Sequence, residues 1–187
     1  MRTHTVKMLI AALGLAGLLT LAACSDTAVH NAADVTFATD MIPHHQQAVQ
    51  MAELATDRAA SPEVLELAEE IRGAQQPEID TMSGWLEEWG EPVPDDMGGM
   101  DDGAGGMGDM PGMLTDEQLA ELEAADGPAF DEMFLEAMID HHTGAIQMAQ
   151  TEQEDGASAD AIALAEEIET AQTEEIERMR ELLTANG

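Results

Sequence analysis

One stretch of the chain occurs twice, and this repeat constrains the fold more than any other feature of the sequence. The first copy begins at Phe37 and the second at Phe134, and both contain the pattern Met-Ile-x-His-His-x-x-Ala-x-Gln-Met-Ala. The offset of 97 residues continues beyond this pattern, because residues 68–71 recur as residues 165–168. A register kept over this length indicates an internal duplication, so the two halves of the chain should fold alike.

Helical periodicity dominates both halves, and no stretch alternates in the manner of a β-strand. Ser61-Pro62 is a helix start, with Ser as the N-cap and Pro at the first helical position. Thr115-x-x-Gln118 resembles a capping box. Pro43 should kink the first helix or delay its start. The predicted helices cover about residues 34–58, 62–89, 115–125, 129–153 and 159–184.

Residues 90–114 are rich in Gly, Pro and Asp and have no helical period, which predicts a linker. The linker separates a hairpin at residues 34–89 from a second hairpin at residues 128–184. Each hairpin has an apolar face that it cannot bury alone, and packing the two faces together gives an all-α four-helix bundle with pseudo-twofold symmetry. Five methionines in the linker fit a secondary Cu(I) or Ag(I) site and a plain acidic linker equally well: Met97, Met100, Met107, Met110 and Met113.

The first 23 residues have the features of a lipoprotein signal peptide. A charged start precedes an apolar run at residues 8–21, which is short for a membrane-spanning helix. The segment from Leu21 to Cys24 then matches a lipobox, and Cys24 is the only cysteine. We expect export, cleavage before Cys24, and lipidation of its thiol. A polar tether at residues 24–33 would then anchor the domain to the outer face of the cell membrane. A plain secreted protein is the alternative.

The chain is strongly acidic, with a formal net charge of −33. All 39 acidic residues follow Cys24, and the only fixed cations in that part of the chain are four arginines. This charge argues against nucleic acid and anionic lipid surfaces as partners, because both bind basic faces. It suits the attraction of cations, although solubility or adaptation to high salt explains it equally well.

The repeated pattern places its Met, His and Ala residues on one stripe of each helix, within about 120° of arc. This stripe should face the bundle interior. A buried imidazole without partners costs about 1–3 kcal/mol, so a shared metal, or hydrogen bonds to interior carboxylates and to Gln75 or Gln172, should satisfy the four His. We predict a metal site, with a purely structural role as the alternative. The candidate ligands are His44, His45, His141, His142, Met41, Met51, Met138 and Met148, with Met82 and Met179 from the partner helices.

The donor set favours copper. Imidazole suits several transition metals, whereas thioether sulfur selects Cu(I) and, by the same softness, Ag(I). Binding should weaken below about pH 6, where free imidazole protonates. A di-iron oxidase would need Glu three residues before a His, but Met41, Ile42, Met138 and Ile139 stand there. Since no nucleophile pattern is visible either, we expect no enzyme.

Residues 130–149, F-D-E-M-F-L-E-A-M-I-D-H-H-T-G-A-I-Q-M-A, resemble the signature of a bacterial family called domain of unknown function 305, and residues 41–52 resemble it again. The resemblance covers about residues 34–184. It implies a ferritin-like four-helix bundle, often exported, in a family with periplasmic copper-binding members linked to copper resistance. It also implies that the four His and the flanking Met are the ligands.

The first copy departs from this signature at two positions. Ala33-Asp34 replaces the Phe-Asp lead, and Gln47 stands where the second copy has Gly144. The two half-sites therefore need not have the same affinity.

We expect a membrane-tethered, extracytoplasmic bundle that binds and sequesters copper. The first alternative is a structural or protein-interaction module that binds no metal, and a ferritin-like iron oxidase is less favoured. The long linker also allows dimerisation, because two copies could exchange hairpins through it.

Overall fold

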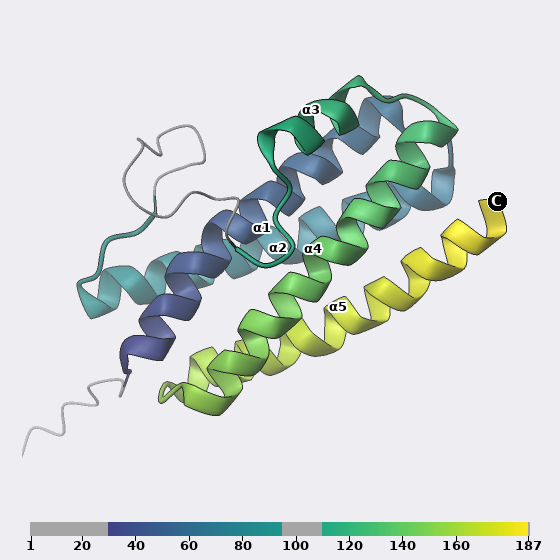
Figure 1. Ribbon diagram of the computed structural model, residues 1–187. Coiled ribbons are helices and arrows are strands. Elements are labelled where there is room, and N and C mark those ends of the chain that lie inside the picture. The colour runs from purple at the N-terminus through teal and green to yellow at the C-terminus, as the bar shows by residue number, and fades with distance from the viewer. Residues whose placement is uncertain (1–29, 95–109, 187) are drawn as a thin grey trace, which may run out of the picture.

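The computed structural model describes residues 30–94 and 110–186 of the 187-residue chain. Within these ranges, four long helices form two hairpins: α1 (Ala32–Arg58) packs with α2 (Pro62–Trp89), and α4 (Pro128–Asp155) packs with α5 (Ala159–Asn186). A short helix, α3 (Asp116–Ala124), precedes the second hairpin, and no strand occurs in the described ranges. The predicted all-α helical bundle is confirmed (Figure 1).

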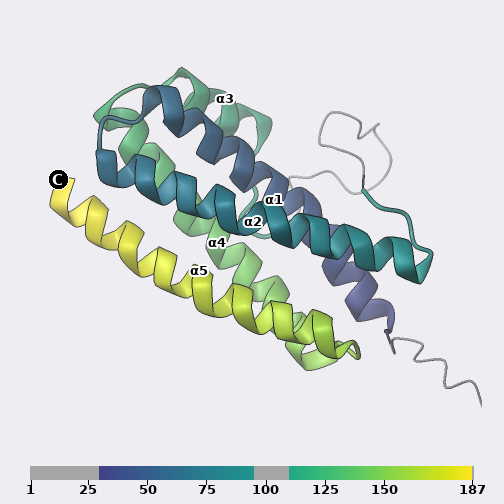
Figure 2. The same ribbon diagram turned by 180° about the vertical axis from the view of Figure 1, so that it is seen from behind.

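Contacts between α1 and α4 join the two hairpins. Figure 2 shows the other side of the bundle, where α2 and α5 lie. Helix α3 lies across the end of the bundle where α1 ends and α4 begins (Figure 1). The predicted signal peptide, Cys24 and most of the tether lie outside the described residues, as do Met97, Met100 and Met107.

The helix starts follow the capping chemistry of the sequence. Ser61 caps α2, and Thr115 forms a capping box with Gln118 at the start of α3. Helix α1 begins earlier than predicted because Asn31 and Asp34 form a second capping box. It then continues through Pro43, so the predicted delayed start is wrong, and residues 32–33 belong to the helix and not to the tether.

Two repeat-related aspartates tie the hairpins together. Asp34, in the first turn of α1, accepts two backbone N–H groups from the turn between α4 and α5, at 3.0 and 2.8 Å. Asp131, at the same position of α4, accepts two backbone N–H groups from the turn between α1 and α2, at 3.0 and 2.8 Å. Both carboxylates are buried, and each satisfies donors that the turns would otherwise bury unpaired.

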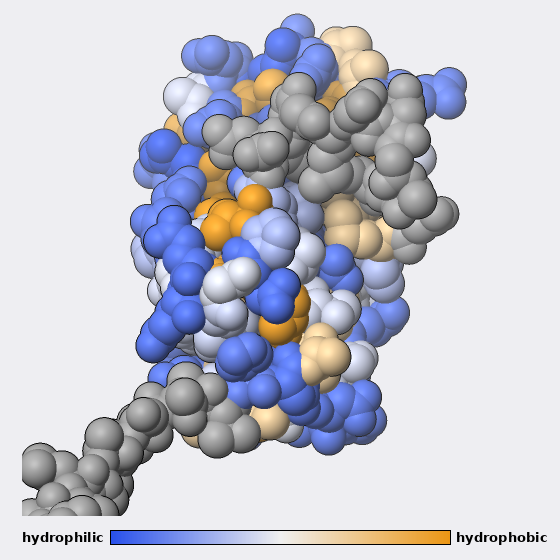
Figure 3. Space-filling model, turned by 90° about the vertical axis from the view of Figure 1, so that its left-hand side faces the viewer, coloured by the Kyte–Doolittle hydropathy of each residue, from blue (hydrophilic) through white to orange (hydrophobic). Residues whose placement is uncertain are grey.

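The core consists of two clusters of buried side chains. One lies at the α3 end and includes Leu122 and Phe130, while the other lies where α1 begins and includes Phe37 and Leu86. On the face seen in Figure 3, hydrophilic groups surround a few hydrophobic ones. Among the described residues, no helix combines the length and apolar character that crossing a membrane requires.

Residues 110–114, the last part of the predicted linker, are not helical and pack against the bundle. We call this segment the strap. Its Met113 and Leu114 are buried, and backbone groups of the strap approach both α1 and α4.

Candidate metal centre

The four histidines of the repeated pattern form one buried layer at the contact between α1 and α4. All four side chains have 0% exposure. Their helices run in opposite directions, because Asn31 at the start of α1 donates a hydrogen bond to Asp155 at the end of α4. The two repeats therefore meet at their own His-His pairs, as the interior-facing stripes predicted.

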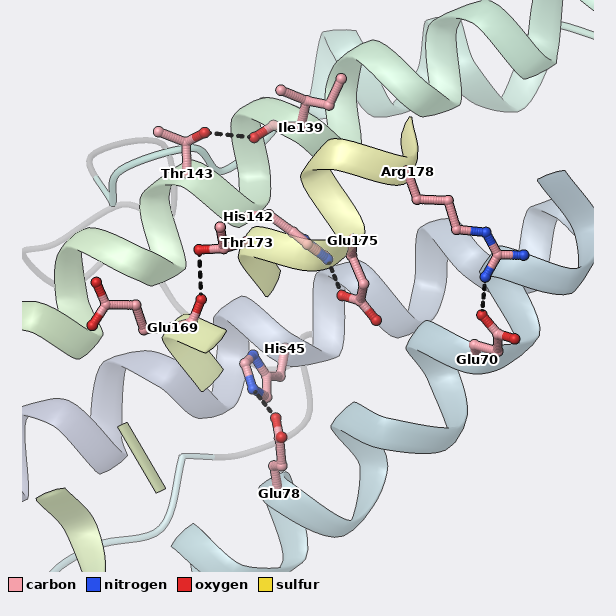
Figure 4. Close-up of polar contacts among 10 residues, drawn as sticks. All are labelled: His45, Glu70, Glu78, Ile139, His142, Thr143, Glu169, Thr173, Glu175 and Arg178. Atoms are coloured by element: carbon pink, nitrogen blue, oxygen red, sulfur yellow. Dashed lines mark hydrogen bonds and ion pairs between the residues drawn. The ribbon is translucent and has the colours of Figure 1, made fainter. Parts of the chain in front are cut away.

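Each hairpin supplies one carboxylate to this layer. Nε2 of His45 lies 2.7 Å from Oε2 of Glu78 on α2, and Nε2 of His142 lies 2.6 Å from Oε2 of Glu175 on α5 (Figure 4). Both glutamates are only 20% exposed. The two pairs are related by the repeat offset, so the duplication preserved this interaction.

The other two histidines lie against each other. The rings of His44 and His141 have centroids 3.8 Å apart and are tilted by 40°. His44 Nε2–H donates to the carbonyl oxygen of Pro111 at 3.0 Å. Burial, and then the nearby His45, lower the pKa of His44 to about 3. Burial, and then the neighbouring His44 and His142, lower the pKa of His141 well below its usual value.

For His44 and His141, these lowered pKa values move the expected competition between protons and a metal to a pH below 6. Both imidazoles stay neutral well below that pH, because charging them inside the bundle would require desolvated cations beside one another.

Imidazole nitrogens without a hydrogen-bond partner are concentrated in this layer. Nδ1 of all four His, together with Nε2 of His141, has no partner among the described residues. The predicted hydrogen bond between Gln75 and a His is wrong, because the buried amide of Gln75 has no hydrogen-bond partner among the described residues. Oε1 of Gln172 has none there either. The layer therefore contains several buried imidazole nitrogens that no described residue satisfies, and two of its rings, His44 and His141, have strongly lowered pKa values.

The strap covers one side of the layer, and it explains why the two repeats differ at one position. Gln47 accepts from Leu114 N–H at 2.8 Å and donates to the carbonyl oxygen of Leu114 at 2.9 Å. At the matching position of α4, a Cβ on Gly144 would lie 1.8 Å from the Pro111 carbonyl oxygen. Gln47 therefore holds the strap on α1, while Gly144 lets it pass close to α4.

The methionines divide into two groups around the His layer. Met41 and Met82 are fully buried in the cluster where α1 begins, whereas Met138 and Met179 are fully buried in the cluster at the α3 end. These four make two repeat-related sets of two, which we call the methionine pairs, and each has one member on α1 or α4 and one on α2 or α5.

The other two methionine candidates lie farther along the helices. Met51 belongs to the cluster at the α3 end, and half-buried Met148 borders the opposite one. Each stands seven residues beyond the first His of its repeat, a rise of about 10 Å along the helix axis. The structure therefore does not bring Met51 and Met148 into the His layer.

We expected interior carboxylates beside the His, and these are Glu78 and Glu175, which the sequence did not single out. A signal for them existed, because both recur at the offset of 97 residues, three residues after Gln75 and Gln172. Periodicity alone could not select them, because they stand among many other glutamates on α2 and α5.

Among the described residues, no three His, Cys, Asp or Glu side chains converge into a metal-holding group. A metal bound in the His layer would therefore need thioether ligands as well, and Met41, Met82, Met138 and Met179 fit that need. The fold and the site together define a four-helix bundle of two duplicated hairpins around a buried His layer flanked by methionine pairs.

The chain belongs to the family described as a domain of unknown function, DUF305, whose model matches residues 34–183. The structure is similar to a DUF305 protein from Streptomyces coelicolor, with 36% identity and a TM-score of 0.74 over 83% of this chain and 94% of that one. A DUF305 fragment from Deinococcus radiodurans has 27% identity and a TM-score of 0.73 over 83% and 97% of the two chains.

The protein CopM is also similar. Its Cu(II)-bound form has 34% identity and a TM-score of 0.68 over 81% of this chain and 96% of that one. CopM has further been solved in Cu(I)-bound and Ag-bound forms. No curated protein matched the chain.

Proposed function

We propose that this protein binds copper in the His layer and sequesters it without catalysing a reaction, with Ag(I) as a further ion of the same softness. The observation that carries this proposal is the set of buried imidazole nitrogens without hydrogen-bond partners. Buried polar groups are normally paired, so several unpaired ones in one buried layer support the presence of a ligand.

The tautomers of three histidines follow from their partners. A carboxylate or a carbonyl oxygen only accepts, so the Nε2 atom facing it carries the proton in His44, His45 and His142. His44 is neutral and has one proton, so its Nδ1 keeps a lone pair; in the neutral form of His45 and His142, which a metal requires, Nδ1 does the same. A metal-binding His typically donates its other N–H to a carboxylate, and His45 and His142 already do so.

The thioethers match the same metal. Soft sulfur ligands favour Cu(I), and imidazole accepts both copper oxidation states. Met41 with Met82, and Met138 with Met179, would provide one thioether pair on each side of the His layer. The CopM structures support copper and silver as the ions, because that similar protein has been solved with Cu(I), Cu(II) and Ag.

The setting that we propose is extracytoplasmic, with the chain anchored through a lipid on Cys24. The sequence of the N-terminal segment is the basis of this part of the proposal, and the Streptomyces coelicolor relative is described as a candidate secreted protein. Methionine and histidine suit such a compartment, because a cysteine ligand would be exposed to oxidation there.

Titration of the protein with Cu(I) against a competing chelator tests the proposal. The test variant replaces His44, His45, His141 and His142 with Ala, and a second variant changes Met41, Met82, Met138 and Met179 to Leu, which keeps the core apolar. We expect both variants to lose more than about tenfold in affinity, or 1.4 kcal/mol. Circular dichroism of each variant reports whether the helices remain. Unchanged affinity in both folded variants would favour the protein-interaction alternative.

A further inference from the structure

Helix α3 covers a groove between the end of α1 and the start of α4. Leu119 and Leu122 of α3 pack there among buried and half-buried side chains of both helices. Because the bundle is a duplication, the same groove must exist a second time, between the start of α1 and the end of α4. Nothing in the described part of the chain plays the role of α3 at that second place.

The second groove is open and measures about 410 Å³, the size of a ligand pocket. We call it the open groove. It is lined by Ala32, Ala33, Thr36, Phe37 and Asp40 of α1 and by Met148, Thr151 and Glu152 of α4. The matching positions in the other repeat lie 97 residues away, and they line the covered groove: Ala129, Phe130, Met133, Phe134, Ala137, Met51, Leu54 and Ala55.

The two grooves differ in chemistry at positions that matter for an occupant. Asp40 stands where the covered groove has Ala137, and Glu152 stands where it has Ala55. Phe37 and Met148 keep the apolar character of their counterparts. An occupant of the open groove must therefore accommodate two carboxyl groups as well as an apolar surface.

Glu152 brings a buried carboxyl group to this lining. Its side chain is only 1% exposed, and its hydrogen-bonding neighbour is the carboxylate of Asp34. Burial, and then its contact with Asp34, raise the pKa of Glu152 to about 8, and burial also raises the pKa of Asp40. An ionised carboxylate in such a place is costly, so Glu152 retains a proton beside Asp34, and half-buried Asp40 is the group that a cation from outside would compensate.

We propose that the open groove docks an amphipathic helix of another protein, which places apolar side chains on Phe37 and Met148 and a basic side chain against half-buried Asp40. The covered groove shows that a helix with Leu residues three positions apart fits this shape. The net charge of −33 favours a basic partner, because opposite charge draws such a partner to the surface.

A second copy of the chain does not fit the open groove. Helix α3 carries four acidic residues and no basic one, so the α3 of another copy would bring like charge to Asp40. Two copies of so acidic a chain also repel each other as wholes.

Peptides based on the α3 sequence test the proposal with the full chain. One fluorescent peptide has the sequence of residues 113–125, and a second replaces its acids, Asp116, Glu117, Glu121 and Glu123, with Lys. Anisotropy at physiological salt should show binding of the Lys peptide only. A scrambled Lys peptide has the same charge without the apolar face, and we expect it to bind at least about tenfold more weakly.

Variants of the protein then locate the binding. Ala33→Trp fills the open groove and should weaken binding of the Lys peptide by at least about tenfold, the loss of one strong anchor contact. Asp40→Ala with Glu152→Ala recreates the apolar floor of the covered groove and should abolish the preference for Lys. Glu69→Ala with Glu166→Ala removes two exposed carboxylates elsewhere and should leave binding unchanged. No binding, or equal binding to Ala33→Trp and to the wild type, would overturn the proposal.

Discussion

Nε2 of His45 lies 2.7 Å from Oε2 of Glu78, and the same relationship recurs 97 residues later between His142 and Glu175. Each carboxylate accepts from Nε2–H, which fixes the orientation of the ring and leaves Nδ1 as the nitrogen that a metal could use. Replacing both glutamates with Ala should therefore lower copper affinity by about 10–100-fold, the usual effect of losing such a partner. Gln at both positions still accepts the N–H and should cost less.

Competition titration of the wild type and these two double variants with Cu(I) measures the effect. Glu69→Ala, on the exposed side of α2, controls for the loss of a negative charge. Equal affinity in the Ala double variant and the wild type would show that the ring orientation does not matter for binding.

Asp131 should contribute more to stability than an ordinary surface aspartate, because it accepts two backbone N–H groups from the opposite hairpin. Asp131→Ala leaves those donors buried and unpaired, at a cost of about 1.5–3 kcal/mol in the free energy of unfolding. Asp126→Ala is the matched control, since its side chain is 77% exposed and its ion pair with Arg58 is worth under about 1 kcal/mol. Urea denaturation of the two variants gives the comparison directly.

Two glycine substitutions should change the free energy of unfolding in opposite directions. A Cβ on Gly144 would lie 1.8 Å from the Pro111 carbonyl oxygen, so Gly144→Ala must displace the strap and should cost about 1–3 kcal/mol. Gly73 lies inside α2 with nothing within 4 Å of a Cβ, so Gly73→Ala should stabilise by up to about 1 kcal/mol. Thermal unfolding of both variants is decisive, and a stabilised Gly144→Ala protein would mean that the strap does not press on α4.

Glu152 should make stability fall as pH rises. The pKa of Glu152 is about 8 in the folded protein, whereas the ordinary value of 4.5 applies to the unfolded chain. Between these two values the folded state therefore binds more protons than the unfolded state. The stabilising contribution is complete below about pH 4.5 and is lost as pH rises toward 8. Glu152→Gln cannot ionise, so its melting temperature relative to the wild type should increase from about pH 5 to about pH 8.5. Exposed Glu154→Gln should show no such trend, and a flat difference for Glu152→Gln would contradict the assigned pKa.

Much of the fold could be predicted because the signals are local. Ser61-Pro62 and Thr115 with Gln118 begin helices where the sequence indicated, since N-capping depends on residues within one turn. The first helix begins two residues before its predicted start, because Asn31 forms a capping box with Asp34, and it continues through Pro43.

The sequence by itself determined the duplication, the helices and the burial of the four His, because each follows from spacing along one chain segment. Only the tertiary structure decided that Glu78 and Glu175 face His45 and His142. It also decided that the strap crosses Gly144, and that helix α3 covers one of the two repeat-related grooves and leaves the other open. These relationships join residues that are distant in sequence, and they depend on how helices pack and which side chains meet. The periodicity of a single helix carries no information about the neighbour it will contact.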